Sequence, residues 1–202
     1  MPLKKYFIAI VIPQPLFDKI EAVKNSLLKS HQLKCALRSP SHITLHRPFV
    51  WKEEKEKILI ESLSSFQFEE NFEVILNDYN FFEPRVIYVD VCKNEILNKL
   101  HLELTRFAKQ KLKLFNDVDD KRGFHPHITI AFRDIKKSLF PVLKEKFISE
   151  ELNGTFNYQG FTLLKLSDKW EEAHFFENKS PLNNITDLDL KNINNLRQVN
   201  DI

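Results

Sequence analysis

Apolar residues recur along this chain with two different periodicities, and segments of the two kinds alternate. Runs that are apolar throughout or at every second position predict strands at 6–12, 34–37, 42–46, 72–81, 86–92, 128–132, 155–166 and 172–176. Apolar residues spaced three and four apart predict helices at 16–28, 52–65, 94–112 and 134–147. This mixture of elements predicts an α+β fold.

Several single residues set the expected boundaries of these elements. Asn94 and Asp134 stand where a helix N-cap is expected. Pro48 is expected to end the strand that begins at His42. The residues Ser167-Asp168-Lys169 predict the turn of a closing hairpin.

The order of elements repeats once along the chain. Residues 4–82 give strand, helix, strand, helix, strand, and residues 85–176 give the same order again. The domain is expected to cover residues 1–177, and an Asn-rich segment, 178–202, to form a flexible C-terminal tail. Two lobes related by a pseudo-two-fold axis would bring the middle strands of the two halves face to face.

Each of these middle strands carries the same short motif, His-x-Thr. The motifs are His42-Ile43-Thr44 and His127-Ile128-Thr129, with the histidines 127 − 42 = 85 positions apart. On a strand, side chains two positions apart share a face and lie roughly 7 Å apart. Each motif therefore presents an imidazole and a hydroxyl together. One imidazole accepts a proton and the other donates one, while the hydroxyls bind phosphoryl oxygens. This set suits metal-independent phosphodiester chemistry.

With both motifs flanked by apolar residues, the chain resembles the two-histidine phosphoesterase superfamily, which includes the RNA 2′,3′-cyclic phosphodiesterases, also called 2′-5′ RNA ligases. The resemblance covers about residues 4–176. It implies a bilobal α+β fold, with two mainly antiparallel sheets flanked by helices around a central cleft. It also implies a catalytic role for His42 and His127 and a phosphate-binding role for Thr44 and Thr129.

Four other residues are candidates for the same cleft. Arg133 follows the second motif near a point where the superfamily often carries an arginine, and we expect it to bind phosphate. His46 shares the strand parity of His42. His125 and Phe124 precede the second motif, and an aromatic ring there would stack a nucleobase. The other interpretation of the phenylalanines is that they belong to the core.

Composition narrows the class of substrate. A net charge of +2 is small for a protein that binds long duplex nucleic acid, so a small phosphodiester or an RNA end fits better. Only three glycines are present, which excludes glycine-rich nucleotide-binding loops. Two cysteines without metal-ligand spacing suggest reduced thiols in a cytoplasmic protein, and no apolar run is long enough to span a membrane.

These observations predict a phosphodiesterase that needs no cofactor and hydrolyses 2′,3′-cyclic phosphates to 2′-phosphates. His127 is assigned as base and His42 as acid, although the pseudo-symmetry permits the reverse, and the reverse reaction would join RNA ends through a 2′-5′ bond. Two alternatives stay open. One is a metal hydrolase built on His42, His46, His125 and His127, and the other is a non-catalytic module that binds a phosphorylated ligand. The oligomeric state is not defined by the sequence.

Overall fold

The computed structural model describes residues 2–115 and 123–179. Its elements run in the order β1 (Leu3–Val11), α1 (Leu16–His31), the 3₁₀ helix η1 (Cys35–Arg38), β2 (His42–Lys52), η2 (Glu53–Lys55), α2 (Glu56–Ser64), β3 (Glu73–Phe82), β4 (Val86–Val91), α3 (Glu95–Lys111), β5 (His127–Ala131), α4 (Phe140–Ile148), β6 (Asn153–Asn157), β7 (Gly160–Leu166) and β8 (Trp170–Glu177). The predicted tail lies almost entirely outside the described residues.

The strands form one eight-stranded sheet in the order β6-β3-β4-β5-β2-β1-β7-β8, and all its neighbours are antiparallel. The α+β class is therefore confirmed. The two predicted sheets are joined into one, through a single residue pair between β2 and β5. Strand β3 lies beside β4 in the second half of the sheet, and β7 lies beside β1 in the first half. This symmetric order is what a duplication would produce.

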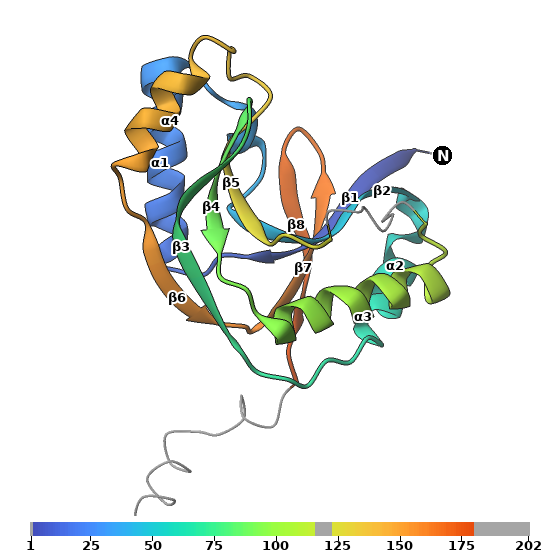
Figure 1. The fold of residues 1–202 in the computed structure, drawn as a ribbon. Helices are drawn as coiled ribbons and strands as arrows, with labels where there is room; N and C mark the ends of the chain where they lie inside the picture. Colours follow the sequence, from blue (N-terminus) through green and yellow to red (C-terminus); the bar gives the residue numbers. More distant parts are fainter. Residues whose placement is uncertain (1, 116–122, 180–202) are drawn as a thin grey trace, which may run out of the picture.

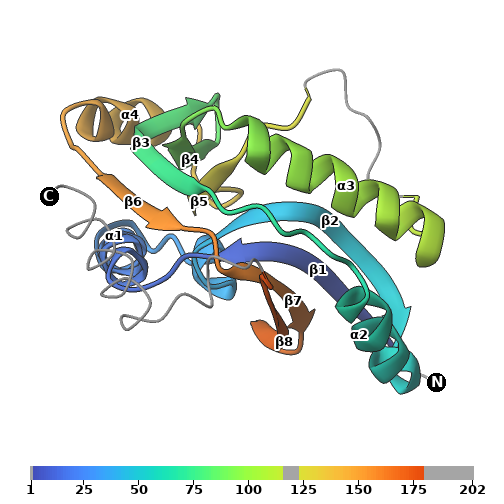
Figure 2. The same cartoon turned by 90° about the horizontal axis from the view of Figure 1, so that it is seen from below.

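The helices lie in two groups at opposite ends of the sheet. Figures 1 and 2 show α1 with α4 at one end and α2 with α3 at the other. The contacts are reciprocal: α1 contacts β5 of the second half, and α3 contacts β2 of the first. Each motif strand is thus supported by a helix from the other half of the chain.

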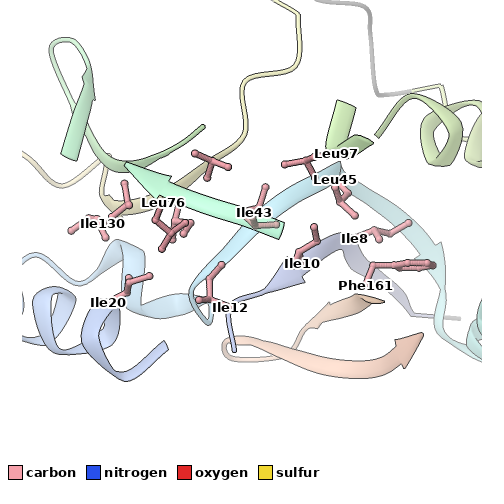
Figure 3. Packing of buried hydrophobic residues seen from close by; sticks show 14 of the residues in the cluster. Ile8, Ile10, Ile12, Ile20, Ile43, Leu45, Leu76, Leu97, Ile130 and Phe161 are labelled. Carbon is pink, nitrogen blue, oxygen red and sulfur yellow. The ribbon is translucent and has the colours of Figure 1, made fainter. Parts of the chain in front are cut away.

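One hydrophobic core lies between the sheet and these helices. Ile8 and Ile10 on β1, Ile43 and Leu45 on β2, and Ile130 on β5 contribute to it, as Figure 3 shows. Helix α3 begins as predicted, because the Asn94 Oδ1 accepts hydrogen bonds of 2.9 Å from the backbone N–H groups of Ile96 and Leu97. Helix α1 ends at Gln32, whose φ of 57° is left-handed.

Four local predictions are corrected. Pro48 does not end β2, which continues to Lys52, because the register with β1 shifts around Pro48 and the ladder tolerates a proline at such a bulge. Residues 34–37 do not form a strand: Lys34 is the N-cap of η1, and residues 35–37 belong to η1 itself. The predicted strand at 155–166 is two strands, β6 and β7, paired with β3 and β1 respectively. Helix α4 begins at Phe140, not at Asp134.

Packing within the described residues continues just past Glu177. Asn178 is buried, and its amide donates to the backbone carbonyl of Glu70 and the side chain of Asn71. Cys35 and Cys92 are both unpaired, half-buried thiols. In the described residues, no helix is long and apolar enough to cross a membrane.

Candidate active site

The two His-x-Thr motifs lie side by side in the centre of the sheet. Ile43 of β2 pairs with Ile128 of β5, and both are fully buried in the core. Because side chains alternate along a strand, the histidine and threonine of each motif lie on the opposite face of the sheet. Antiparallel pairing about these isoleucines sets each histidine next to the other strand's threonine. The motifs therefore converge on one face, although as neighbours rather than across a cleft.

The two motifs also have the same register with their outer neighbours. On one side His42, Ile43 and Thr44 pair with Val11, Ile10 and Ala9 of β1. On the other, His127, Ile128 and Thr129 pair with Asp90, Val89 and Tyr88 of β4. Equivalent pairing around both motifs supports the predicted internal repeat.

Each catalytic candidate is held by a backbone carbonyl two residues before it. The Nδ1 atom of His42 lies 2.7 Å from the carbonyl oxygen of Pro40, and that of His127 lies 2.7 Å from the carbonyl oxygen of His125. A carbonyl oxygen only accepts, so Nδ1 carries the proton in both rings. The Nε2 atom of each neutral ring then carries the lone pair and is available to a substrate.

Burial determines the charge of both imidazoles. Desolvation, together with the charge of the Lys24 ammonium, lowers the pKa of His42 to about 4. Desolvation also lowers the pKa of His127, which the nearby Asp90 carboxylate partly offsets. Both rings are therefore neutral near pH 7 in the free protein. The two histidines interact electrostatically, because His127 also contributes to the lowering at His42.

This electrostatic state predicts how stability depends on pH. A histidine whose pKa is lowered on folding binds its proton more readily in the unfolded chain, so acid favours unfolding. Stability should be complete above pH 6.5 and fall as the pH drops from 6.5 towards 4, then level off as far as His42 is concerned. In His42→Asn this fall should be smaller, and chemical denaturation at several pH values measures it. Equal acid sensitivity in both proteins would contradict the assignment.

A pocket of about 430 Å³ opens beside the motifs. Its lining includes His42, Thr44, Thr129 and Arg133, four of the residues predicted for the site. His127 is not part of this lining; its ring lies half-buried against Phe82 and Tyr88, with centroids 5.1 Å from each. The remaining lining residues are Lys5, Phe7, Cys35, Ala36, Arg38, Ser39, Pro48, Phe132, Leu166 and Trp170.

The charges of the pocket are all of one sign. Lys5, Arg38 and Arg133 line it, and no aspartate or glutamate is among its lining residues in the described chain. Aromatic rings add flat apolar surface: Phe7 lies 4.8 Å from the His42 ring and 4.6 Å from Trp170, centroid to centroid. Cations together with aromatic rings are the groups that bind an anionic phosphate attached to a nucleobase.

Arg133 lines the pocket and has an unusual backbone conformation. Strand β5 ends at Ala131, and Arg133 has a left-handed φ of 62°. Its guanidinium lies over the Phe132 ring, 5.1 Å from the centroid. The next residue, Asp134, accepts hydrogen bonds of 2.7 and 2.8 Å from the backbone N–H groups of Lys34 and Cys35. Asp134 therefore caps the start of η1 rather than α4, and it fixes the segment that carries Arg38.

The other three candidates lie away from this pocket. His46 is fully buried, with its ring edge-on to Phe49, because the bulge in β2 turns it into the core. Phe124 stacks on His101 at 4.0 Å. His125 is near the His127 ring but is directed towards Asp90, with 3.9 Å between its Nε2 and the Oδ1.

The four histidines of the metal-hydrolase alternative therefore do not form one cluster, because His46 lies in the core, and the described residues contain no group of three potential metal ligands. Sequence reasoning missed Arg38, Trp170 and Lys24 as site residues. The sequence signal for Lys24 is that it occupies a position on the apolar face of α1, together with Leu16, Ile20 and Leu27.

Comparison with known protein families gives a match that covers most of the chain. The family model described as the 2′-5′ RNA ligase superfamily matches residues 12–170. The chain belongs to this superfamily. A comparison with curated proteins gives no significant match.

Solved structures of the superfamily share the fold. Escherichia coli LigT complexed with 3′-AMP is 17% identical, with a TM-score of 0.61, over 89% of this chain and 100% of LigT. LigT complexed with NADP+ is 20% identical, with a TM-score of 0.59, over 88% and 99%. A protein of Thermus thermophilus is 15% identical, with a TM-score of 0.58, over 88% and 99%.

Proposed function

We propose that this member of the superfamily is a phosphodiesterase that hydrolyses 2′,3′-cyclic phosphates on RNA ends or small nucleotides. The observation that carries the proposal is the pair of imidazoles held alike on one face of the sheet. Each has Nδ1–H bound to a carbonyl and Nε2 available, and each has the other motif's threonine beside it. LigT structures with 3′-AMP, NADP+, ATP and phosphate support a nucleotide-sized, phosphate-bearing ligand.

The proposed reaction is an in-line displacement at phosphorus. One imidazole takes a proton from the attacking water, and the water oxygen forms a new P–O bond. The P–O3′ bond breaks, and the other imidazole gives its proton to O3′, which leaves a 2′-phosphate and a 3′-hydroxyl. Charge that develops on the non-bridging oxygens is stabilised by Thr44, Thr129 and Arg133. With the 5′-hydroxyl of a second RNA end in place of water, the same displacement forms a 2′-5′ linkage.

The protonated imidazole acquires its proton together with the substrate. Both rings are neutral in the free protein, and a phosphate monoanion beside them favours the imidazolium form. Lys5, Arg38 and Arg133 line the pocket, but they are not among the groups whose charge lowers the pKa of either ring, so their charges do not oppose this protonation. Substrate binding therefore protonates the imidazole that acts as the acid, whereas the imidazole that acts as the base is already neutral in the free protein.

The test is turnover on a defined panel. Purified protein is given 2′,3′-cyclic nucleotides, an oligonucleotide with a 2′,3′-cyclic end, and 3′,5′-cyclic nucleotides as the control. We expect hydrolysis of the 2′,3′-cyclic substrates alone, a 2′-phosphate product in ³¹P NMR, and no loss of rate in EDTA. Binding without turnover would favour the non-catalytic module. Activity lost in EDTA and restored by zinc would favour a metal hydrolase.

A further inference from the structure

A lysine is buried directly behind the first motif. Lys24 of α1 is 2% exposed, on the same helix face as the core residues Ile20 and Leu27. A buried ammonium is costly unless it is paired and hydrogen-bonded. Its Nζ lies 2.9 Å from the Glu21 Oε1 and 3.4 Å from the carbonyl oxygen of Ser39, and burial lowers its pKa. A methionine would fill this space, so the charge calls for an explanation.

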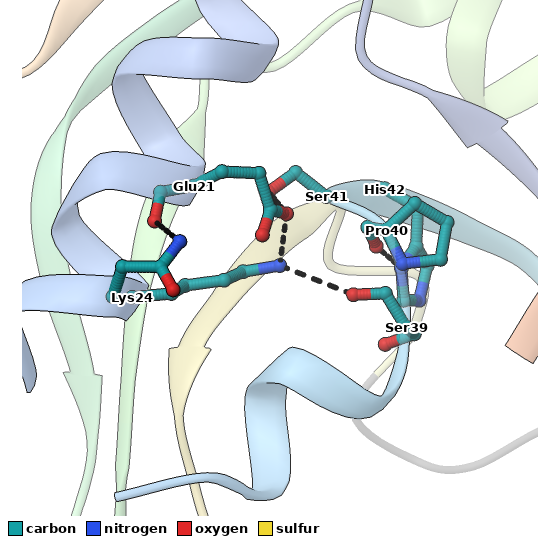
Figure 4. Close-up of polar contacts among 7 residues, drawn as sticks. Glu21, Lys24, Ser39, Pro40, Ser41 and His42 are labelled. Atoms are coloured by element: carbon teal, nitrogen blue, oxygen red, sulfur yellow. Dashed lines mark hydrogen bonds and ion pairs between the residues drawn. The ribbon is translucent and has the colours of Figure 1, made fainter. Parts of the chain in front are cut away.

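The same carboxylate oxygen also binds the residue next to the catalytic histidine. The hydroxyl of Ser41, itself fully buried, donates to the Glu21 Oε1 at 2.8 Å. The carbonyl oxygen of Ser41 accepts from the N–H of Ile12 at 3.0 Å. The segment 39–41 is thus fixed at three points by α1 and by the residue after β1. Figure 4 shows Pro40 between these points, with its carbonyl accepting the His42 Nδ1–H.

The second motif is held differently. Pro126 occupies the position equivalent to Ser41 and is likewise buried, and its ring fixes the backbone without a hydroxyl. The groups whose charge acts on the His127 ring are His125 and Asp90, not a lysine. The buried ion pair is therefore a feature of one of the two pseudo-equivalent histidines.

We propose that Glu21 and Lys24 are positioning residues of the active site, which act on His42 through the segment Ser39–Ser41. By fixing the Pro40 carbonyl they fix the tautomer and the direction of the His42 ring, so that its Nε2 is presented to the pocket. This inference rests on the proposed function only where turnover is the readout. The state of the imidazole itself can be measured without any substrate.

The pair also makes a directional prediction, because its two charges act on His42 with opposite sign. Lys24 disfavours the imidazolium and Glu21 favours it, and His127 of β5 is the other titratable group that acts on the ring. Lys5, Arg38 and Arg133 line the same pocket and are left unchanged in the test. Removing only the lysine charge should raise the pKa of His42, and removing only the glutamate charge should lower it.

The experiment compares Lys24→Met, Glu21→Gln and Ser41→Ala with Lys19→Met, an exposed lysine of the same helix, as the matched control. Histidine NMR titrations give the pKa of both rings, and long-range ¹H–¹⁵N spectra show which ring nitrogen carries the proton. We expect opposite shifts of the His42 pKa in the two charge variants, a smaller shift at His127, and a mixed tautomer in Ser41→Ala. With 2′,3′-cyclic nucleotides, kcat should fall about tenfold to a hundredfold while KM changes less.

The outcomes separate the two proposals. Lys24→Met can unfold the chain for reasons unrelated to His42. Glu21→Gln and Ser41→Ala are near-isosteric changes, so they test the positioning role more directly. Thermal unfolding is recorded for each variant. Unchanged titration and tautomer of His42 in these folded variants would overturn the inference. The expected changes at His42 in a protein that hydrolyses no cyclic phosphate would overturn the proposed function and leave the positioning role intact.

Discussion

Replacement of His42 or His127 by alanine is expected to remove most turnover of 2′,3′-cyclic substrates and to spare the fold. Each variant loses a proton carrier, which contributes on the order of 10²–10⁴-fold, or about 3–5 kcal/mol of activation free energy. Both side chains are only half-buried, on the face of the sheet opposite the core, so little core packing is lost. Steady-state kinetics and circular dichroism of each variant provide the measurement.

The double variant and the threonines give the controls for this prediction. In His42→Ala/His127→Ala, turnover should fall by a factor far smaller than the product of the factors measured for the two single variants. The reason is that the two residues act in one step. Thr44→Val and Thr129→Val should cost less than either histidine change, since each removes one neutral donor to an anion and leaves both proton carriers. Multiplicative losses for the two histidines would mean that they act independently, which the mechanism does not allow.

The dependence on the leaving group distinguishes acid from base. An acid variant recovers activity on a substrate whose leaving group needs no proton, such as a nitrophenyl phosphodiester, and a base variant does not. The sequence-based assignment predicts recovery in His42→Ala. The reverse assignment, with His42 as base, predicts recovery in His127→Ala instead. The same two variants therefore decide between the assignments.

Gly160→Ala is expected to destabilise the protein strongly. Gly160 has a φ of +147°, and a Cβ there would lie 2.1 Å from the carbonyl oxygen of Phe176 on the paired strand β8. The backbone of the β7–β8 hairpin must shift to relieve this clash. We expect a loss of about 3 kcal/mol in the free energy of unfolding, or a fall in Tm of about 6–12 °C.

Gly123→Ala is the matched control for this substitution. Gly123 also has a positive φ, +68°, but a Cβ there would meet nothing within 4 Å. Its replacement should therefore cost only the strain of a left-handed alanine, about 1 kcal/mol. Thermal and denaturant unfolding of the two variants measure the difference. Equal destabilisation by the two substitutions would contradict the role given to the Phe176 carbonyl.

Much of the site was predictable because strand geometry is local. The alternation in His42-Ile43-Thr44 and His127-Ile128-Thr129 already places each histidine with its threonine on one face, and the structure keeps that parity. The same holds for α3, where the Asn94 side chain caps the helix within three residues. Signals of this kind depend only on neighbours in the sequence.

Predictions were wrong where distant residues override local preference. His46 obeys the parity of β2 in the sequence but is buried, because the register with β1 shifts between Ile8 and Ala9, which pair with His46 and Thr44. Asp134 would cap a following helix on local grounds, yet its carboxylate binds the N–H groups of Lys34 and Cys35, about a hundred residues earlier in the chain. That contact caps the 3₁₀ helix η1, which occupies most of the segment predicted as a strand at 34–37.

The sequence by itself determined the chemical groups of the site, their pairing on strands and the order of the elements, because side-chain alternation and helical periodicity follow from backbone geometry alone. Apart from Arg133, which the sequence predicted, only the tertiary structure decided which cations join them. Arg38 and Arg133 meet at one pocket because η1 is bound to the end of β5, and Lys24 and Glu21 lie behind His42 because α1 packs across the sheet. Contacts between elements so far apart in the sequence depend on how the whole core packs, which no local pattern encodes.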